Sequence, residues 1–348
     1  MIEQPATSMM EHLLRTASRK TVDRAAIIKK IQDIHVPTTV DDELAKEIEI
    51  MLAHIMSGNA TSGYALTILG KSGAGKSKAL DHLLDNHPSF ASFDGLYNRM
   101  SLSLRAVTPP SCTWKKLGAR LAAQSGLPVH GETNEDVVWN DILLDRMRKM
   151  GTRVIVLDEF QHVLEAPTSH AYTHLSNSIK NLMQTPSYPI WVIVSGVPEI
   201  EGILDRDEHK QLDRRVPIIR VKDMPNDETT VGKVVETVQK LADASDIRIG
   251  FPLIHEFVQR LMHGGIWRFG MTVQIIKNSL EKCIWDDKAG GVLLPNHFAQ
   301  GYARLARDCP DEQNVFKSAD WQKIQREVDD KGYLVDPASA PKRRRKKG

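Results

Sequence analysis

Apolar and polar residues follow two different patterns along this chain. Before about residue 225, short continuous apolar runs are separated by amphipathic stretches, and after it the apolar residues recur at spacings of three and four. Continuous runs are typical of strands buried on both faces of a parallel sheet. Spacings of three and four are typical of amphipathic helices. The chain is therefore predicted to be an α/β core, a parallel sheet flanked by helices, followed by a smaller all-helical domain.

The elements of the core are predicted segment by segment. Strands are predicted at 65–69, in the centre of 95–107, at 153–157, within 188–196 and at 217–221. Helices are predicted after residue 77, at 113–124, at 135–150 with Gly151 as its C-terminal glycine, at 176–183 and from 198 to 204. Strands and helices that alternate in this way are typical of a parallel sheet with crossover helices.

The two ends of the chain read mainly as helix. Helices are predicted at 21–30 and 40–56, separated by Pro37, and at 229–242, 252–262, 271–285 and 296–307. Trp321, Ile324 and Val328 suggest a last short helix. We therefore expect a helical N-terminal segment (1–60), an α/β core (61–224), a helical lid (225–310) and a polar C-terminal segment (311–348).

Composition indicates a cytoplasmic protein. Its 348 residues are 41% hydrophobic, but no apolar run approaches the roughly 18 residues of a membrane span. The first thirty residues lack the apolar stretch of a signal peptide. Three widely spaced cysteines favour free thiols over a disulfide framework. We therefore expect no membrane partner.

Positive charge is concentrated at the C-terminus. The net charge is +2, yet the six residues Lys342–Lys347 are all basic, and without them the charge is −4. This tail would bind DNA phosphates, dock on a partner protein or simply be a solvated end. Any nucleic-acid contact of the folded part must come from a local patch.

The segment GKSGAGKS matches the phosphate-binding loop G-x-x-x-x-G-K-[ST], with a strand before it and a helix after it. Its members are Gly70, Lys71, Ser72, Gly73, Ala74, Gly75, Lys76 and Ser77. Glycines let successive backbone N–H groups point at phosphate oxygens, and the helix N-terminus adds positive potential. Lys76 is expected to reach the β- and γ-phosphates, and Ser77 to ligate Mg²⁺. The predicted ligands are ATP and Mg²⁺.

Polar residues end two of the later strands. Asp158 and Glu159 follow the apolar run 154–157, which is the Walker B pattern. Asp158 is predicted to hold Mg²⁺, and Glu159 to polarise the attacking water. Ser195 ends the next strand and is a candidate for positioning that water, although an ordinary strand-to-loop Ser-Gly is the alternative.

A basic cluster lies between the second strand and the next helix. Its members are Arg99, Arg105, Lys115, Lys116 and Arg120. Such a cluster is either a solvated helix face or a patch that contacts nucleic-acid phosphates.

The order of these motifs resembles that of the AAA+ ATPases over about residues 40–300. Within that class the chain is similar to the TniB/TnsC transposition regulators. The resemblance rests on LDEFQH at 157–162, VSGVP at 194–198, QLDRR at 211–215 and Gly265-Ile266-Trp267-Arg268.

The resemblance implies roles for individual residues. Ser195 would be sensor 1, where Asn or Thr is commoner. Arg215, with Arg214 as its rival, would be the arginine finger that completes a neighbour's active site in trans. Arg268 would be sensor 2, and Arg105, Lys115 and Lys116 would line the DNA.

The resemblance also implies an activity and partners. We expect a bacterial, nucleoid-associated, DNA-stimulated ATPase that forms rings or helical filaments on duplex DNA without reading its sequence. It would link a target-selection protein to a transposase. A replication initiator or helicase loader is the main alternative. A two-lobed helicase is disfavoured, because it would need a second α/β lobe where this chain reads as helix. The presence of Glu159 argues against a non-hydrolysing scaffold. A metabolic kinase would need a substrate pocket that the sequence does not indicate.

Overall fold

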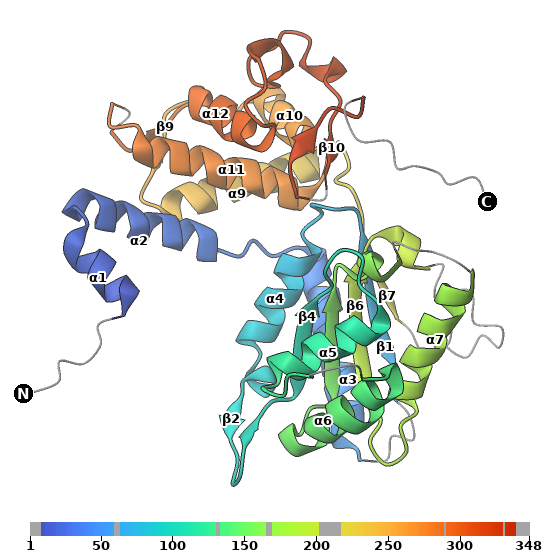
Figure 1. Ribbon diagram of the computed structural model, residues 1–348. Coiled ribbons are helices and arrows are strands. Elements are labelled where there is room, and N and C mark those ends of the chain that lie inside the picture. Colours follow the sequence, from blue (N-terminus) through green and yellow to red (C-terminus); the bar gives the residue numbers. More distant parts are fainter. Residues whose placement is uncertain are drawn as a thin grey trace, which may run out of the picture. The chain divides into compact units, whose positions relative to one another are not determined.

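The computed structural model describes residues 8–58, 63–129, 133–164, 169–201, 217–288, 290–329 and 331–338 (Figure 1). The chain divides into two compact units, each with its own hydrophobic core. The α/β unit is Pro37–Lys222. The helical unit combines Met1–Val36 with Asp223–Gly348.

The N-terminal helices belong to different units. Helix α2 (Arg19–Asp33) buries Ile31 in the core of the helical unit, whereas α3 (Thr39–Met56) buries Leu44, Ile48 and Met51 against the sheet of the α/β unit. The first division therefore falls at residues 36/37 and not at 60/61. Both helices have an apolar face, and the sequence does not say which core each face joins.

The α/β unit contains a five-stranded sheet in the order β4-β5-β6-β1-β7, with every pair parallel. The strands are β1 (Ala65–Gly70), β4 (Ser103–Val107), β5 (Val154–Asp158), β6 (Trp191–Gly196) and β7 (Ile218–Val221). Strands β1 and β6 are buried along their whole length, as the continuous apolar runs predicted. The predicted α/β fold with a parallel sheet is confirmed.

Two layers of helices cover the sheet. Helix α3 and α4 (Lys76–Asn86) share a core with one face. The other face carries α5 (Trp114–Gln124), α7 (Ser169–Met183) and a continuous helical segment made of η2 (Val137–Leu143) and α6 (Leu144–Met150). The segment predicted as one α-helix over 135–150 is thus a π-helix in its first half. Short elements complete the unit: η1 (Pro88–Phe90), the hairpin β2 (Phe93–Asp94) and β3 (Arg99–Met100), η3 (Phe160–Leu164) and η4 (Pro198–Ile200).

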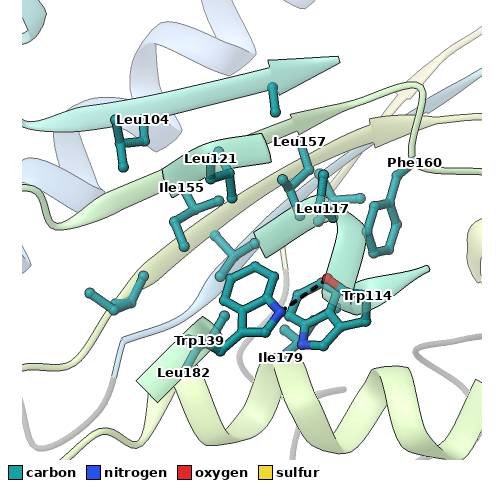
Figure 2. Packing of buried hydrophobic residues seen from close by; sticks show 14 of the residues in the cluster. Leu104, Trp114, Leu117, Leu121, Trp139, Ile155, Leu157, Phe160, Ile179 and Leu182 are labelled. Atoms are coloured by element: carbon teal, nitrogen blue, oxygen red, sulfur yellow. Dashed lines mark hydrogen bonds between the residues drawn. The ribbon is translucent and has the colours of Figure 1, made fainter. Parts of the chain in front are cut away.

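Two tryptophans anchor the second helical layer. Trp114 and Trp139 stack with their ring centroids 4.1 Å apart, and Nε1 of Trp139 donates to the carbonyl oxygen of Trp114 at 3.0 Å (Figure 2). Gly118 lies on the same helix as Trp114, and a Cβ there would be only 2.7 Å from the Trp139 ring. Close packing of the indole therefore requires glycine at this position.

The helical unit is built from α1 (Met9–Thr16), α2, α9 (Glu228–Ala244), α10 (His255–Gly264), α11 (Phe269–Trp285) and α12 (Pro295–Leu305). The last four helices match the helices predicted after residue 225. Two-stranded pairs join β8 (Arg248–Ile249) to β9 (Val292–Leu293) and β10 (Glu327–Val328) to β11 (Leu334–Val335). Buried Lys277 on α11 donates to the carbonyl oxygens of Gln32 and Ile34, and so holds the end of α2.

The short helix predicted around Trp321 and Val328 is wrong. Trp321 begins a single 3₁₀ turn, η6 (Trp321–Lys323), which follows η5 (Asp311–Gln313), and Val328 belongs to β10. Trp321 and Leu334 are both buried in the core of the helical unit. Packing onto that core, and not an amphipathic helix, therefore accounts for the apolar residues of this segment. Within the described ranges, no helix combines the length and apolar character needed to cross a bilayer.

Candidate active site

The order of the strands brings three sequence motifs to one edge of the sheet. Strand β6 lies between β1 and β5, and all three are parallel, so their carboxyl ends share an edge. The phosphate loop follows β1, Asp158 and Glu159 end β5, and Ser195 lies near the end of β6. Adjacent strands are about 4.8 Å apart, which separates the loop strand from the acidic strand by about 10 Å. Ser195 therefore lies on the strand between the loop strand and the acidic strand.

The phosphate loop depends on glycine for two reasons. Gly73 has φ 79° and Gly75 has φ 106°, both in the region that favours glycine. A Cβ on Gly70 would lie 2.9 Å from the Cβ of Val221 on the neighbouring strand, so this position requires glycine for close approach. The loop fits the predicted backbone turn.

The N-terminus of α4 is prepared for an anion. No side chain caps it, and its first turn contains no acidic residue. The first N–H groups of such a helix face the ligand side and carry partial positive charge. Lys76 is buried in the same turn, and its Nζ donates to the carbonyl oxygens of Gly70 at 2.7 Å and Lys71 at 3.1 Å. The ammonium group is therefore held inside the loop, next to the helix end.

The acidic pair at the end of β5 has an unusual backbone. Glu159 has φ 51°, which is uncommon for a residue with a side chain and recurs at functional sites. Its N–H donates to Oδ1 of Asp158 at 2.9 Å, and its carbonyl oxygen accepts from the N–H of His162 at 3.1 Å. Both acidic side chains are half-buried. These contacts fix the turn in which the two carboxylates leave the strand.

Negative charge extends onto α4. The pKa of Asp81 is raised by burial and, next, by the negative charges of Asp158 and Asp85. Asp81 lies five residues after Lys76 on the helix that begins at the phosphate loop. A cation placed between the loop and Asp158 would therefore meet a concentration of carboxylates.

Two buried hydroxyl groups flank the acidic strand. Ser195 is fully buried, and its Oγ has no hydrogen-bond partner among the described residues. The same holds for Oγ1 of Thr108, which follows β4 and whose N–H donates to the carbonyl oxygen of Asp158 at 2.9 Å. Buried hydroxyl groups are normally satisfied. The unsatisfied Oγ of Ser195, between the loop and the acids, fits a polar ligand such as a nucleotide with its magnesium ion.

The predicted sensor 2 residue lies in the helical unit. Arg268 precedes α11, after the non-glycine residues Ile266 and Trp267 with φ 49° and 59°. Its Nε lies 4.0 Å from Oδ1 of Asp223, the first residue after the α/β unit. The finger candidates Arg214 and Arg215, and the basic tail, lie outside the described residues.

The three basic residues predicted to contact DNA are not brought together. Arg105 alternates with Leu104 and Ala106, which pack toward α5, so its side chain takes the opposite face and pairs with Asp85 on α4 at 2.5 Å. Lys115 and Lys116 are exposed on α5. Only these two remain together as a basic patch.

One residue of the site was missed by sequence reasoning. Gln161 in η3 donates from Nε2 to Oε2 of Glu159, and its Oε1 accepts from the N–H of Val197 at 3.3 Å. The sequence offered only one signal, a glutamine two positions after the Walker B glutamate. Its second partner, 36 residues later, is visible only in the fold.

Solved structures that share this fold include Cdc6 and ORC proteins. Aeropyrum pernix ORC2, with ADPNP and ADP, has a TM-score of 0.55 at 13% identity and covers 79% of this chain and 71% of its own. Pyrobaculum aerophilum Cdc6p gives 0.52 at 12% identity, with 78% and 69% covered. Aeropyrum pernix ORC1, solved in complex with DNA, gives 0.51 at 13% identity, with 79% and 67% covered. At these identities the likeness establishes the AAA+ fold.

The family follows from a sequence comparison. No curated protein sequence matches this chain. The family model described as bacterial TniB protein matches residues 30–224, which is more than half of the chain and contains the phosphate loop, the acidic pair and Ser195. The chain therefore belongs to the TniB family.

Proposed function

We propose that this protein is an ATP-hydrolysing regulator of DNA transposition that assembles on duplex DNA. One observation carries the ATPase part: strand β6, with its buried and unsatisfied Ser195, separates the phosphate-loop strand from the acidic strand. In this proposal, the terminal phosphate and the attacking water meet next to this polar group. The transposition part rests on membership of the TniB family.

Each residue of the site has a role in this proposal. The loop N–H groups and Lys76 bind the β- and γ-phosphates, with Nζ moving from the carbonyl oxygens of Gly70 and Lys71. Glu159 orients the attacking water and accepts its proton. Ser195 donates its unsatisfied hydroxyl to the terminal phosphate or to that water.

Ser77 and Asp158 are the residues that would hold Mg²⁺. Both belong to the edge of the sheet described above, and hydroxyl and carboxylate oxygens suit this ion. When bound, Mg²⁺ would neutralise charge on the phosphates. Nearby Asp81 adds to the negative potential around the cation without being a predicted ligand.

Assembly is proposed from the family. An arginine finger, Arg215 or its rival Arg214, would complete the site of a neighbouring subunit, and Arg268 would report the nucleotide to the helical unit. Lys115 and Lys116 are the proposed DNA contacts, because both are exposed on α5. Arg105 is a weaker choice, since Asp85 already neutralises it. A target-selection protein and a transposase would be the protein partners.

The ATPase is tested by phosphate release with and without duplex DNA, using wild type and Glu159→Gln. Equal turnover with and without DNA contradicts DNA stimulation. Glu159→Gln should lower turnover by at least about 100-fold while retaining ATP binding. Negative-stain imaging with DNA and a slowly hydrolysed ATP analogue tests assembly: rings or filaments support the proposal, and monomers that ignore DNA refute it.

DNA contact is tested by a charge-matched pair of double variants. Lys115→Ala with Lys116→Ala removes two charges from α5, and Lys233→Ala with Lys240→Ala removes two from exposed positions of α9. Each lost phosphate contact should reduce the slope of log K against log salt by about 0.9. The α5 variant should therefore lose about two units of slope, and the α9 variant none.

A replication initiator or helicase loader is the second candidate. The Cdc6 and ORC structures share the fold, and ORC1 was solved with DNA. Such a protein would use the same nucleotide site with different partners. Capture of a transposase by the ATP-bound protein, with no capture of a replicative helicase, separates the two candidates.

A further inference from the structure

Gln161 uses both ends of its side-chain amide within the candidate active site. Its Nε2 donates to the carboxylate of Glu159, and its Oε1 accepts from the N–H of Val197 at 3.3 Å. Val197 directly follows β6, the strand that carries Ser195. One side chain therefore joins the carboxylate at the end of β5 to the backbone just beyond β6.

These two partners fix the orientation of the amide. A carboxylate only accepts and a backbone N–H only donates, so a rotation of the amide by 180° would place two donors together and two acceptors together. Space for the amide is also provided by the backbone. A Cβ on Gly196 would lie 2.6 Å from Oε1 of Gln161, and it would also meet Ile200. Because Gly196 has no side chain, the space that Oε1 of Gln161 occupies stays free of a Cβ atom.

The backbone of Glu159 is held separately from its carboxylate. Its N–H and carbonyl oxygen are bound by Asp158 and His162, and these contacts set the turn with φ 51°. They leave the side-chain torsions of a half-buried glutamate undetermined. The contact from Gln161 reaches Oε2 itself. Gln161 is thus placed to set where the carboxylate points.

We propose that Gln161 is a positioning residue that holds Glu159 in the orientation needed for hydrolysis and ties it to the end of β6. The inference rests on the proposed function, because it needs Glu159 to act on the attacking water. Gln161 thereby ties the carboxylate of Glu159 to the end of the strand that carries Ser195, the other group proposed to meet that water. A misplacement of about 1 Å can cost about 100-fold in rate.

Two substitutions separate the hydrogen bond from packing. Gln161→Glu keeps the shape of the side chain but replaces the donating NH₂ with an oxygen, and Gln161→Leu removes both polar ends. Both variants should lower kcat about 10- to 100-fold, while the Kd for ATP stays within about twofold, because phosphate binding belongs to the loop. Gln184→Leu makes the same chemical change at an exposed position and should leave kcat unchanged.

A double variant tests whether Gln161 acts through Glu159. In the Glu159→Gln background, Gln161→Glu should change the residual turnover by less than about twofold, because the group that it positions is already gone. A structural role would instead lower turnover by the same factor in both backgrounds and would lower the melting temperature of Gln161→Glu.

The outcomes distinguish this inference from the proposed function. If wild type hydrolyses ATP, Glu159→Gln lowers turnover by at least about 100-fold, and Gln161→Glu keeps kcat within about threefold of wild type, only the inference fails. A rise in kcat also overturns it, since the contact would then restrain Glu159. If wild type does not hydrolyse ATP, the proposed function fails and the inference falls with it.

Discussion

Removing the hydroxyl group of Ser195 should stabilise the protein and impair its activity. The Oγ atom is fully buried without a partner, and an unsatisfied buried hydroxyl costs about 1–3 kcal/mol. Ser195→Ala removes that cost and leaves a void of about one methyl group, which costs about 1 kcal/mol. The expected net gain is about 1 kcal/mol.

Turnover should change in the opposite direction. If the hydroxyl donates to a charged group in the reaction, its loss removes about 1.5–3 kcal/mol, or about 10- to 100-fold in kcat. Thr67→Val is the matched control, because Oγ1 of Thr67 is also buried and unsatisfied. Thr67 lies on the same face of β1 as Ala65 and Leu69, which pack in the core shared with α5. It should stabilise the unit without changing turnover.

The assay is differential scanning calorimetry combined with phosphate release. The two units can unfold separately, and the transition that ADP shifts upward identifies the α/β unit. For a unit of this size, 1 kcal/mol corresponds to about 2–4 °C in Tm. A lower Tm for Ser195→Ala would mean that the hydroxyl group has a hydrogen-bond partner in the protein. Unchanged turnover would mean that Ser195 takes no part in hydrolysis. Either result would refute the reasoning.

Three further predictions concern stability. Gly118→Ala should lower the Tm of the α/β unit by about 2–4 °C, because overpacking against an indole costs about 1–3 kcal/mol. This cost exceeds the gain of about 1 kcal/mol in helix propensity from glycine to alanine. The control is Gly232→Ala on α9, where a Cβ meets nothing within 4 Å, and it should raise the Tm of the helical unit. Lys277→Met should leave two carbonyl groups at the end of α2 without their donor, and limited proteolysis should then cut between α2 and α3 faster than in wild type. Burial, and next the charge of Glu47, raises the pKa of Tyr64 from 10.0 to about 12. The contribution of Tyr64 to stability is therefore fully present below pH 10 and is lost as the pH rises toward 12. Tyr64→Phe should flatten this part of the curve of unfolding free energy against pH.

Motifs whose residues are adjacent in the chain were predictable from the sequence. The phosphate loop, the acidic pair and Ser195 each lie at the end of a continuous apolar run, so the pattern that predicts a buried strand also predicts the edge of the sheet where they meet. The alternation of side chains along a strand also predicts which face of the sheet Arg105 takes, although Arg105 lies near Lys115 and Lys116 in the sequence. Arg105, between Leu104 and Ala106 in a strand, had to face away from α5 and its two lysines.

Features that depend on distant partners were not predictable. The apolar faces of α2 and α3 look alike in the sequence, and only the fold assigns one to each core. The role of Gln161 needs Val197, which follows β6 and lies 36 residues later in the chain. The apolar spacing over residues 135–150 predicts an α-helix and gives no signal of the π-helix at Val137–Leu143, which packs Trp139 onto Trp114. In each case the deciding contact joins residues far apart in the chain.

The division of the chain at residues 36/37 and 222/223 has a consequence for biosynthesis. Helix α2 leaves the ribosome early, but its partners in the helical unit follow only after residues 37–222 have been translated. At about 5–20 residues per second this delay is on the order of ten seconds or more, during which the α/β unit can fold as one uninterrupted segment. The nascent N-terminus must stay unassociated through that interval. Folding of the helical unit is therefore coupled to completion of the chain. A polypeptide that ends before residue 223 would carry the candidate active site without the unit that contains Arg268.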